Sequence, residues 1–330
     1  MPVLNVLVAG AGINGLLSAF MLTRAGARVT LCDADDIPNT ANASHGAHRL
    51  IHPWQNGDMA PEVARALALW RDLLSEVDCD GFEETGVLVA GPGPVGHGAA
   101  AAPSDRLPGS DRFAMRRLFP TFGVLMAAEI QTALVRWLVS RDVRLMPRAA
   151  VTRIDAQSGT VRIDGAGQER FDAVVLAAGP GLAGFADQFG LGPVRSWRCH
   201  VVYAPPDAPE VPAVAWADLG GRDMWGMSAL RGYPAKFGCG ALSHSAGRPG
   251  PDADEVRKAL ADAYVAIHPV YEFLYRGRVA TNAWTAVDGT RRLRRHGRCL
   301  VVTSDNGGGF KYAPLVATDV CRMVSGLLAA

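Results

Sequence analysis

The stretch NVLVAGAGINGLLSAFMLTRAGARVTLCDAD, residues 5–35, decides the fold. It opens with the apolar run NVLVA, typical of a buried strand, and passes through a G-x-G-x-x-G turn into a segment that predicts a helix to about Thr23. Gly26 suits the end of that helix, and RVTLCD predicts a second strand that closes on Asp33. A strand, a glycine-rich turn, a helix and a strand ending in an acid form a β-α-β unit that binds a dinucleotide.

Each glycine of the turn has its own physical role. Gly10 permits the tight turn, Gly12 lets the backbone approach a pyrophosphate, and Gly15 lets helix and strand pack closely. The helix N-terminus directs free N–H groups and the positive end of its dipole toward the phosphates, and Asp33 can accept hydrogen bonds from ribose hydroxyls. The predicted contacts of this half of the cofactor are Gly10, Gly12, Ile13, Asn14, Gly15, Asp33 and Ala34.

The same stretch has an alternative reading as a secretion signal or a membrane helix, because no charge occurs between Met1 and Thr23. A signal peptide needs basic residues ahead of its apolar run, and the chain up to Leu4 has none. A spanning helix needs about twenty residues without breakers, whereas three glycines and Asn14 interrupt this run. The sequence therefore predicts a cytoplasmic protein without a membrane segment.

Composition excludes several classes of function. The 330 residues are 49% hydrophobic, and 33 basic against 32 acidic residues leave a net charge of +1. This balance argues against nucleic acid or a membrane surface as a partner. The six cysteines form no C-x-x-C pair and have no histidine at zinc-like spacing, so no metal site is predicted and reduced thiols are expected.

A local run of positive charge, RRLRRHGR, covers residues 291–298. Such a run is usually a solvated turn between two strands. The alternative is a docking patch for an acidic carrier protein that presents the substrate. Both interpretations remain open at the level of sequence.

The rest of the chain predicts an α/β protein of two domains. Apolar periodicity predicts helices over residues 60–77, 129–139 and 253–266 and from about Leu315, and short alternating strands from residue 150 to 176. Residues 194–287, rich in β-branched and aromatic side chains, predict a mainly antiparallel sheet. The expected division is a Rossmann-like, FAD-binding domain over residues 1–80, 140–190 and 290–330, and a substrate domain over residues 81–139 and 191–289.

Four blocks of this sequence resemble the FAD-dependent amine oxidases of the sarcosine oxidase and D-amino-acid oxidase superfamily. They are the opening stretch, SHGAHRLIH at residues 44–52, AKFGCG at 235–240 and GGGFKY at 307–312. The similarity is greatest to the monomeric sarcosine oxidase and N-methyltryptophan oxidase branch. It implies oxidation of an amine or amino acid at the carbon beside nitrogen, with bound FAD as cofactor and dioxygen reduced to hydrogen peroxide.

The resemblance also implies positions for the flavin. Arg49 would lie against the ring, where a cation helps the reduced flavin hold its negative charge, and the glycines at 307–309 would let the backbone approach its far edge. The expected flavin contacts are Ser44, His45, Arg49, Val151, Ala178, Gly179, Asn282, Gly307, Gly308, Gly309, Phe310 and Lys311.

Two lysines carry catalytic expectations. Lys311 matches a family lysine that binds the substrate carboxylate, and Lys236 matches a lysine on the flavin face opposite the substrate that favours the reduction of dioxygen. With Arg49 they form the expected catalytic set. The alternative for each is an ordinary surface cation, since Ala235 and Phe237 fit either orientation of the strand that carries Lys236.

Three positions depart from the family pattern. Asn282 stands where relatives carry the cysteine that attaches the flavin, so FAD is expected to bind without a covalent link unless His45 provides one. His52 replaces a second carboxylate-binding arginine, which makes substrate affinity sensitive to pH, and Trp284 replaces a smaller aromatic residue. These residues predict a substrate pocket that is not built for sarcosine.

Three rival functions follow from the same residues. An aromatic-ring hydroxylase shares the first glycine motif, but the segment SDNGGGFKY at residues 304–312 disfavours it. A flavin dehydrogenase that ignores dioxygen would share all the binding residues. A degenerate relative that binds flavin without catalysis is suggested by His52 and by a shortened region between residues 90 and 130.

Overall fold

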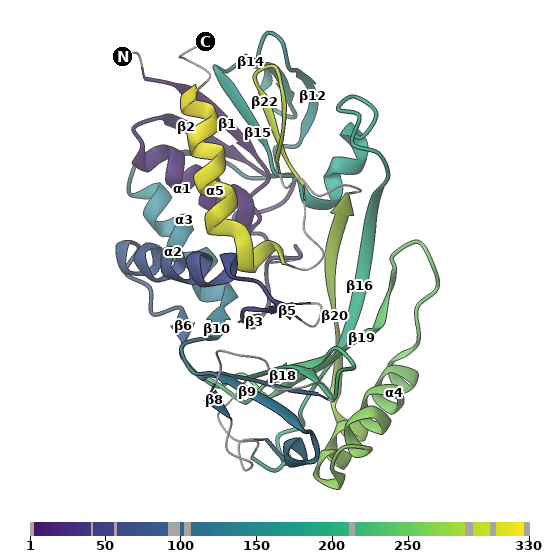
Figure 1. Ribbon diagram of the computed structural model, residues 1–330. Helices are drawn as coiled ribbons and strands as arrows, with labels where there is room; N and C mark the ends of the chain where they lie inside the picture. Colours follow the sequence, from purple (N-terminus) through teal and green to yellow (C-terminus); the bar gives the residue numbers. More distant parts are fainter. Residues whose placement is uncertain are drawn as a thin grey trace.

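The computed structural model describes residues 3–40, 42–55, 58–91, 100–101, 107–210, 215–287, 293–303 and 308–326. These residues form two large sheets and three small ones (Figure 1). The six-stranded sheet has the order β11-β2-β1-β15-β22-β21 and the eight-stranded sheet the order β20-β16-β19-β18-β17-β7-β9-β8. The predicted combination of a Rossmann-like sheet with a mainly antiparallel one is confirmed.

The six-stranded sheet is parallel except at one edge. Its parallel strands are β1 (Asn5–Ala9), β2 (Arg28–Cys32), β11 (Arg144–Met146), β15 (Ala173–Leu176) and β22 (Cys299–Val302), and β21 (Leu293–His296) pairs antiparallel to β22. The central β1 is fully buried at Val6, Leu7 and Val8, because both faces of a parallel sheet are covered.

Helices cover one face of this sheet and a small sheet covers the other (Figure 1). α1 (Ile13–Arg24) packs against α3 (Ala127–Val139) and α5 (Gly309–Gly326), and α2 (Glu62–Glu76) packs against α5. The covering sheet consists of β12 (Val151–Asp155), β13 (Thr160–Ile163) and β14 (Gly167–Arg170). The expected division of the chain stays a prediction, and the structure places α3, assigned to the substrate part, beside α1.

The last helix differs from the expected one at its start. α5 begins at Gly309 rather than near Leu315, although Pro314 lies inside it. Proline lacks the amide that would donate to the carbonyl of Phe310. Trp70 of α2 supplies that hydrogen bond through Nε1 at 3.2 Å, and its ring stacks on Phe310 with centroids 5.5 Å apart. A contact from a distant helix therefore lets α5 begin before its proline.

The eight-stranded sheet is antiparallel except where β17 pairs with β7. Its aromatic core includes Trp216, whose Nε1 donates to the hydroxyl of Tyr264 at 3.0 Å. A helix, α4 (Ala253–Val265), covers part of one face (Figure 1). The strands are β7 (Val87–Gly91), β8 (Ala100–Ala101), β9 (Met115–Phe119), β16 (Val194–Tyr203), β17 (Ala215–Leu219), β18 (Met224–Met227), β19 (Lys236–Ser245) and β20 (Arg278–Val287).

Short elements join the two large sheets. β3 (His48–Ile51), β10 (Gly123–Met126) and β6 (Phe82–Glu83) form one small sheet, and β4 (Trp54–Gln55) pairs with β5 (Asp58–Met59). The remaining helical turns are Ser110–Arg112, Gly179–Phe185 and Pro269–Arg276. Across the described ranges, no helix combines the length and apolar character needed to span a membrane.

Candidate functional site

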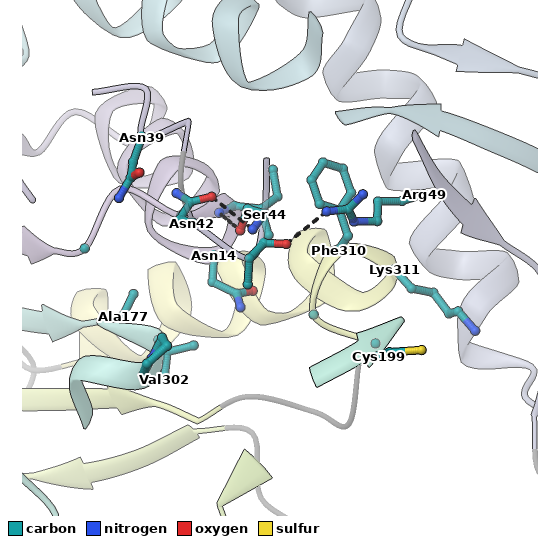
Figure 2. Close-up of a pocket in the computed structure, with 18 of the residues that line it drawn as sticks. Asn14, Asn39, Asn42, Ser44, Arg49, Ala177, Cys199, Val302, Phe310 and Lys311 are labelled. Atoms are coloured by element: carbon teal, nitrogen blue, oxygen red, sulfur yellow. Dashed lines mark hydrogen bonds between the residues drawn. The ribbon is translucent and has the colours of Figure 1, made fainter. Parts of the chain in front are cut away.

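A single large cavity of about 1310 Å³ joins the turn after β1 to the sheet that carries β19. Pockets for small ligands usually measure about 300–1,000 Å³, so this one has room for a dinucleotide together with a small substrate. Figure 2 shows Ser44, Arg49 and Lys311 around the start of α5. The sequence-predicted residues on its wall are Gly10, Gly12, Ile13, Asn14, Asp33, Ala34, Ser44, Arg49, His52, Val151, Ala178, Gly179, Lys236, Gly308, Gly309, Phe310 and Lys311.

The turn into α1 requires its glycines. Gly10 has φ +107°, and a Cβ there would come 2.4 Å from the carbonyl oxygen of Ala177. A Cβ on Gly15 would come 1.7 Å from the carbonyl oxygen of Gly10, so Gly15 permits packing behind the turn and does not line the cavity. Ser44 closes the helix end, because its Oγ accepts a hydrogen bond from the amide of Ile13 at 2.9 Å.

Asp33 connects two loops at this end of the cavity. Its Oδ2 accepts from the amide of Ala11 at 2.6 Å, and its Oδ1 accepts from the amide of Asp35 at 2.9 Å. Each carboxylate oxygen has a second lone pair, so the group can still accept hydrogen bonds from a ribose. The glycine turn on the cavity wall and this carboxylate fit the adenosine end of FAD.

Arg49 is held by backbone carbonyls. Its guanidinium donates to the carbonyl oxygens of His48 at 3.0 Å, of Ala43 at 2.9 Å and of His45. Burial lowers the pKa of Arg49, and no carboxylate in the described ranges pairs with it. His45, expected beside the flavin, contributes the carbonyl that orients Arg49 and is absent from the cavity wall. The Arg49 charge is thus available to a ligand.

Lys236 is buried at the start of β19 with 1% of its surface exposed. Its Nζ lies 5.5 Å from the centroid of the Trp225 ring and 5.9 Å from that of Tyr203. Burial and the nearby Arg49 lower the pKa of Lys236 to about 7. The structure therefore excludes the interpretation of Lys236 as a surface cation.

Lys311 and His52 meet across the cavity. The Nζ of Lys311 lies 3.4 Å from Nε2 of His52, which accepts the hydrogen bond. Burial and the Lys311 ammonium hold the pKa of His52 well below its ordinary value. Burial and Lys311 therefore disfavour the charged form of His52, and the expectation that substrate affinity depends on its titration stays a prediction.

Sequence reasoning missed His48 and Cys199. His48 is fully buried on the cavity wall, neither ring nitrogen has a hydrogen-bond partner in the described chain, and burial together with Lys236 and Arg49 lowers its pKa to about 3. Cys199 of β16 lies opposite Asn282 in the sheet register, and burial raises the pKa of its thiol. The motif SHGAHRLIH includes His48, but the motif alone does not show which side chains of this strand face the cavity.

Three predicted contacts cannot be placed. Gly307 lies outside the described residues, as do the side chains of Asn282 and Trp284. The roles assigned to these three residues stay predictions.

Comparison with known proteins gives partial and whole-chain matches. Monomeric sarcosine oxidase from Bacillus sp. (strain NS-129) is 38% identical over 90 residues, which are 27% of this chain and span 23% of that protein's length. N-methyl-L-tryptophan oxidase from Salmonella arizonae is 25% identical over 361 residues, covering 94% of this chain and 92% of the relative.

A solved structure shares the fold. L-proline dehydrogenase from P. horikoshii superposes with a TM-score of 0.78 at 16% identity, covering 99% of this chain and 94% of that one. A family model described as FAD dependent oxidoreductase matches residues 5–323. The glycine turn, the acid after β2 and the extent of this match agree, and the chain belongs to the FAD dependent oxidoreductase family.

Proposed function

We propose that the protein is an FAD-dependent oxidase of an amine or amino acid that carries a carboxylate near its nitrogen. The observation that supports this most is the meeting of Lys311, Arg49 and Lys236 on one cavity that continues from the dinucleotide turn. Cationic side chains on a cavity wall favour anionic groups of a ligand. The resemblance to sarcosine and N-methyl-L-tryptophan oxidases supports an amine as the reacting group.

Residues of the chain supply binding, orientation and charge. Lys311 would hold the substrate carboxylate, with Nε2 of neutral His52 accepting a hydrogen bond from its ammonium and so directing it. Arg49 would stabilise negative charge that develops on the cofactor ring. FAD in this cavity would supply the redox chemistry, which is oxidation at the carbon beside nitrogen to an imine with reduction of dioxygen to hydrogen peroxide. Placing that carbon against the ring supplies much of the rate.

Lys236 supports the choice of an oxidase. Reduction of dioxygen passes through a negatively charged product, which a nearby cation stabilises. At about 4 Å and an effective dielectric near 20, a unit charge contributes roughly 4 kcal/mol. If three-quarters of this acted on the barrier, the rate would rise on the order of a hundredfold. Because the pKa of Lys236 is about 7, a large share of the side chain carries its charge at neutral pH.

One observation still supports the alternative of a flavin dehydrogenase. The fold is shared with an L-proline dehydrogenase, so architecture does not distinguish enzymes that use dioxygen from those that do not. A flavin-binding protein without catalysis would need neither Lys311 nor Lys236 in the cavity. We further propose that FAD is held without a covalent bond, because Asn282 cannot form a thioether.

One experiment tests the proposal in steps. Acid precipitation of the yellow protein should leave flavin in the supernatant; colour retained in the pellet would indicate covalent attachment. Anaerobic addition of amines and amino acids should then bleach the visible absorption, and air should restore it with one peroxide per cycle. Bleaching without recovery of the absorption in air would favour the dehydrogenase. Absence of bleaching by every amine tested would contradict the proposed amine oxidation.

A further inference from the structure

Two acids face the cavity on the side away from the dinucleotide turn. Asp218 belongs to β17, where the register shifts and its φ is +50°, and Asp223 precedes β18. Trp54 Nε1 donates to Asp218 Oδ2 at 3.1 Å, and the amide of Asp223 donates to Asp218 Oδ1 at 3.2 Å. Trp54 and the backbone amide of Asp223 thus hold the carboxylate of Asp218 beside Asp223.

Glycines of β19 make room for a mixed surface beside Lys236. A Cβ on Gly238 would come 2.4 Å from Cζ2 of Trp225, and a Cβ on Gly240 would come 1.8 Å from Oδ2 of Asp223. Residues at alternate positions of a strand share a face. The cavity wall along β19 therefore presents a cation, then an indole ring, then a carboxylate.

These charges do not neutralise one another. Lys236 lies about 13 Å along the strand from Gly240, at roughly 3.3 Å per residue, and the Trp225 ring stands between them. Within the described residues neither acid forms an ion pair, and Arg222 of the same turn, although on the cavity wall, pairs with neither. Burial and the adjacent Asp218 raise the pKa of Asp223, although its side chain is open to the cavity.

A ligand with opposite charges at its two ends would satisfy this arrangement. His48 is fully buried on the same cavity wall and neither of its ring nitrogens has a hydrogen-bond partner in the described chain, so polar atoms of the chain remain unmatched there. Buried charges without partners are costly, and a ligand of complementary charge removes that cost.

We infer that the substrate is a basic amino acid, whose carboxylate lies at Lys311 and whose distal guanidinium or ammonium lies at the carboxylates of Asp218 and Asp223. The inference rests on the proposed function, because it assigns the far end of the same substrate.

The test uses two matched pairs of amino acids in L, D and N-methylated forms. Arginine is compared with citrulline, which replaces the charged nitrogen by oxygen, and lysine with norleucine. The holoenzyme is mixed anaerobically with each compound, and flavin bleaching gives the rate constant over the dissociation constant. We expect at least one cationic form to exceed its neutral partner by about ten- to a hundredfold, the range of a charge-assisted hydrogen bond.

Variants assign that preference to the acids. Asp223→Asn and Asp218→Asn should each lower the cationic-to-neutral ratio about tenfold or more, and Asp223→Glu should keep part of it. Asp187→Asn, an exposed acid away from the cavity, is the matched control and should keep the full ratio. Retained flavin absorption and an unchanged melting temperature establish that the variants fold.

Two outcomes separate the inference from the proposed function. Equal bleaching by cationic and neutral partners, or an unchanged ratio in Asp223→Asn, overturns the basic substrate but leaves amine oxidation intact. Absence of bleaching by these compounds and by every other amine tested overturns the proposed function itself.

Discussion

The two ends of the cavity are built in different ways. At the dinucleotide end, one continuous segment supplies a glycine turn and Asp33, and the important contacts involve the backbone. At the proposed substrate end, residues from β3, β17, β19 and the start of α5 line one cavity, and charged side chains are prominent among them. The dinucleotide end depends on local backbone geometry that leaves space for a ligand. The other end depends on the fold bringing together side chains from segments that are distant in the sequence. Substitutions should therefore affect the two ends differently.

The largest expected effect is at the dinucleotide end. Gly10→Ala should lose FAD and about 4 kcal/mol of unfolding free energy, because it combines an unfavourable positive φ with a backbone clash. Flavin content and thermal unfolding measure both losses. Gly26→Ala is the control, since Gly26 also has positive φ but no atom within 4 Å of an added Cβ. Full FAD occupancy in Gly10→Ala would show that the turn does not approach the cofactor.

The next effect is at the substrate end. Lys236→Met should slow flavin reoxidation by air on the order of a hundredfold, and reduction under nitrogen much less. In the parent, reoxidation should fall as pH rises through about 7, because the lowered pKa of Lys236 leaves its cation present below that pH and lost above it. Stopped-flow absorption over pH tests this. A pH dependence that persists in Lys236→Met would assign the titration to another group.

A smaller effect is expected for the carboxylate contact. Lys311→Met should weaken binding of a carboxylate-bearing substrate by roughly 1.5–3 kcal/mol, or about ten- to a hundredfold. Spectral titration of the holoenzyme with a slowly reacting analogue measures the affinity. Lys258→Met removes an exposed lysine paired with Asp262 on α4 and should change nothing at the site. If Lys311→Met binds as tightly as the parent, the substrate needs no carboxylate.

The smallest effect joins α2 to the substrate end. Trp70→Phe keeps an aromatic ring against Phe310 but removes the hydrogen bond to its carbonyl, which costs about 1 kcal/mol. Denaturant unfolding measures that loss. Substrate affinity should weaken with it, since Lys311 follows Phe310 directly. A stability loss with unchanged affinity would show that the placement of Lys311 does not depend on this contact.

The sequence predicted the dinucleotide end well, because its glycines and Asp33 act through local backbone geometry. Resemblance to a family placed Arg49, Lys236 and Lys311 on what proved to be one cavity wall.

The missed features depend on contacts between distant segments. Residue spacing does not show that Gly240 leaves room for Asp223, or that Trp54 bonds Asp218. The early start of α5 was missed because Pro314 discourages a helix locally, whereas Trp70, far away in the chain, compensates for it.

The hydrogen bond from Trp70 to the carbonyl of Phe310 also determines how the first turn of α5 opens. Helix ends usually fray, and their amides then exchange with solvent in independent local fluctuations. Here the carbonyl of Phe310 is bonded to α2, and the amide of Tyr312 donates to the carbonyl of Gly308 at 3.0 Å. In hydrogen-exchange terms, the Tyr312 amide should share the protection of α2 and open together with it. The cation of Lys311 would then belong to the cooperative unit of the core rather than to a fluctuating end.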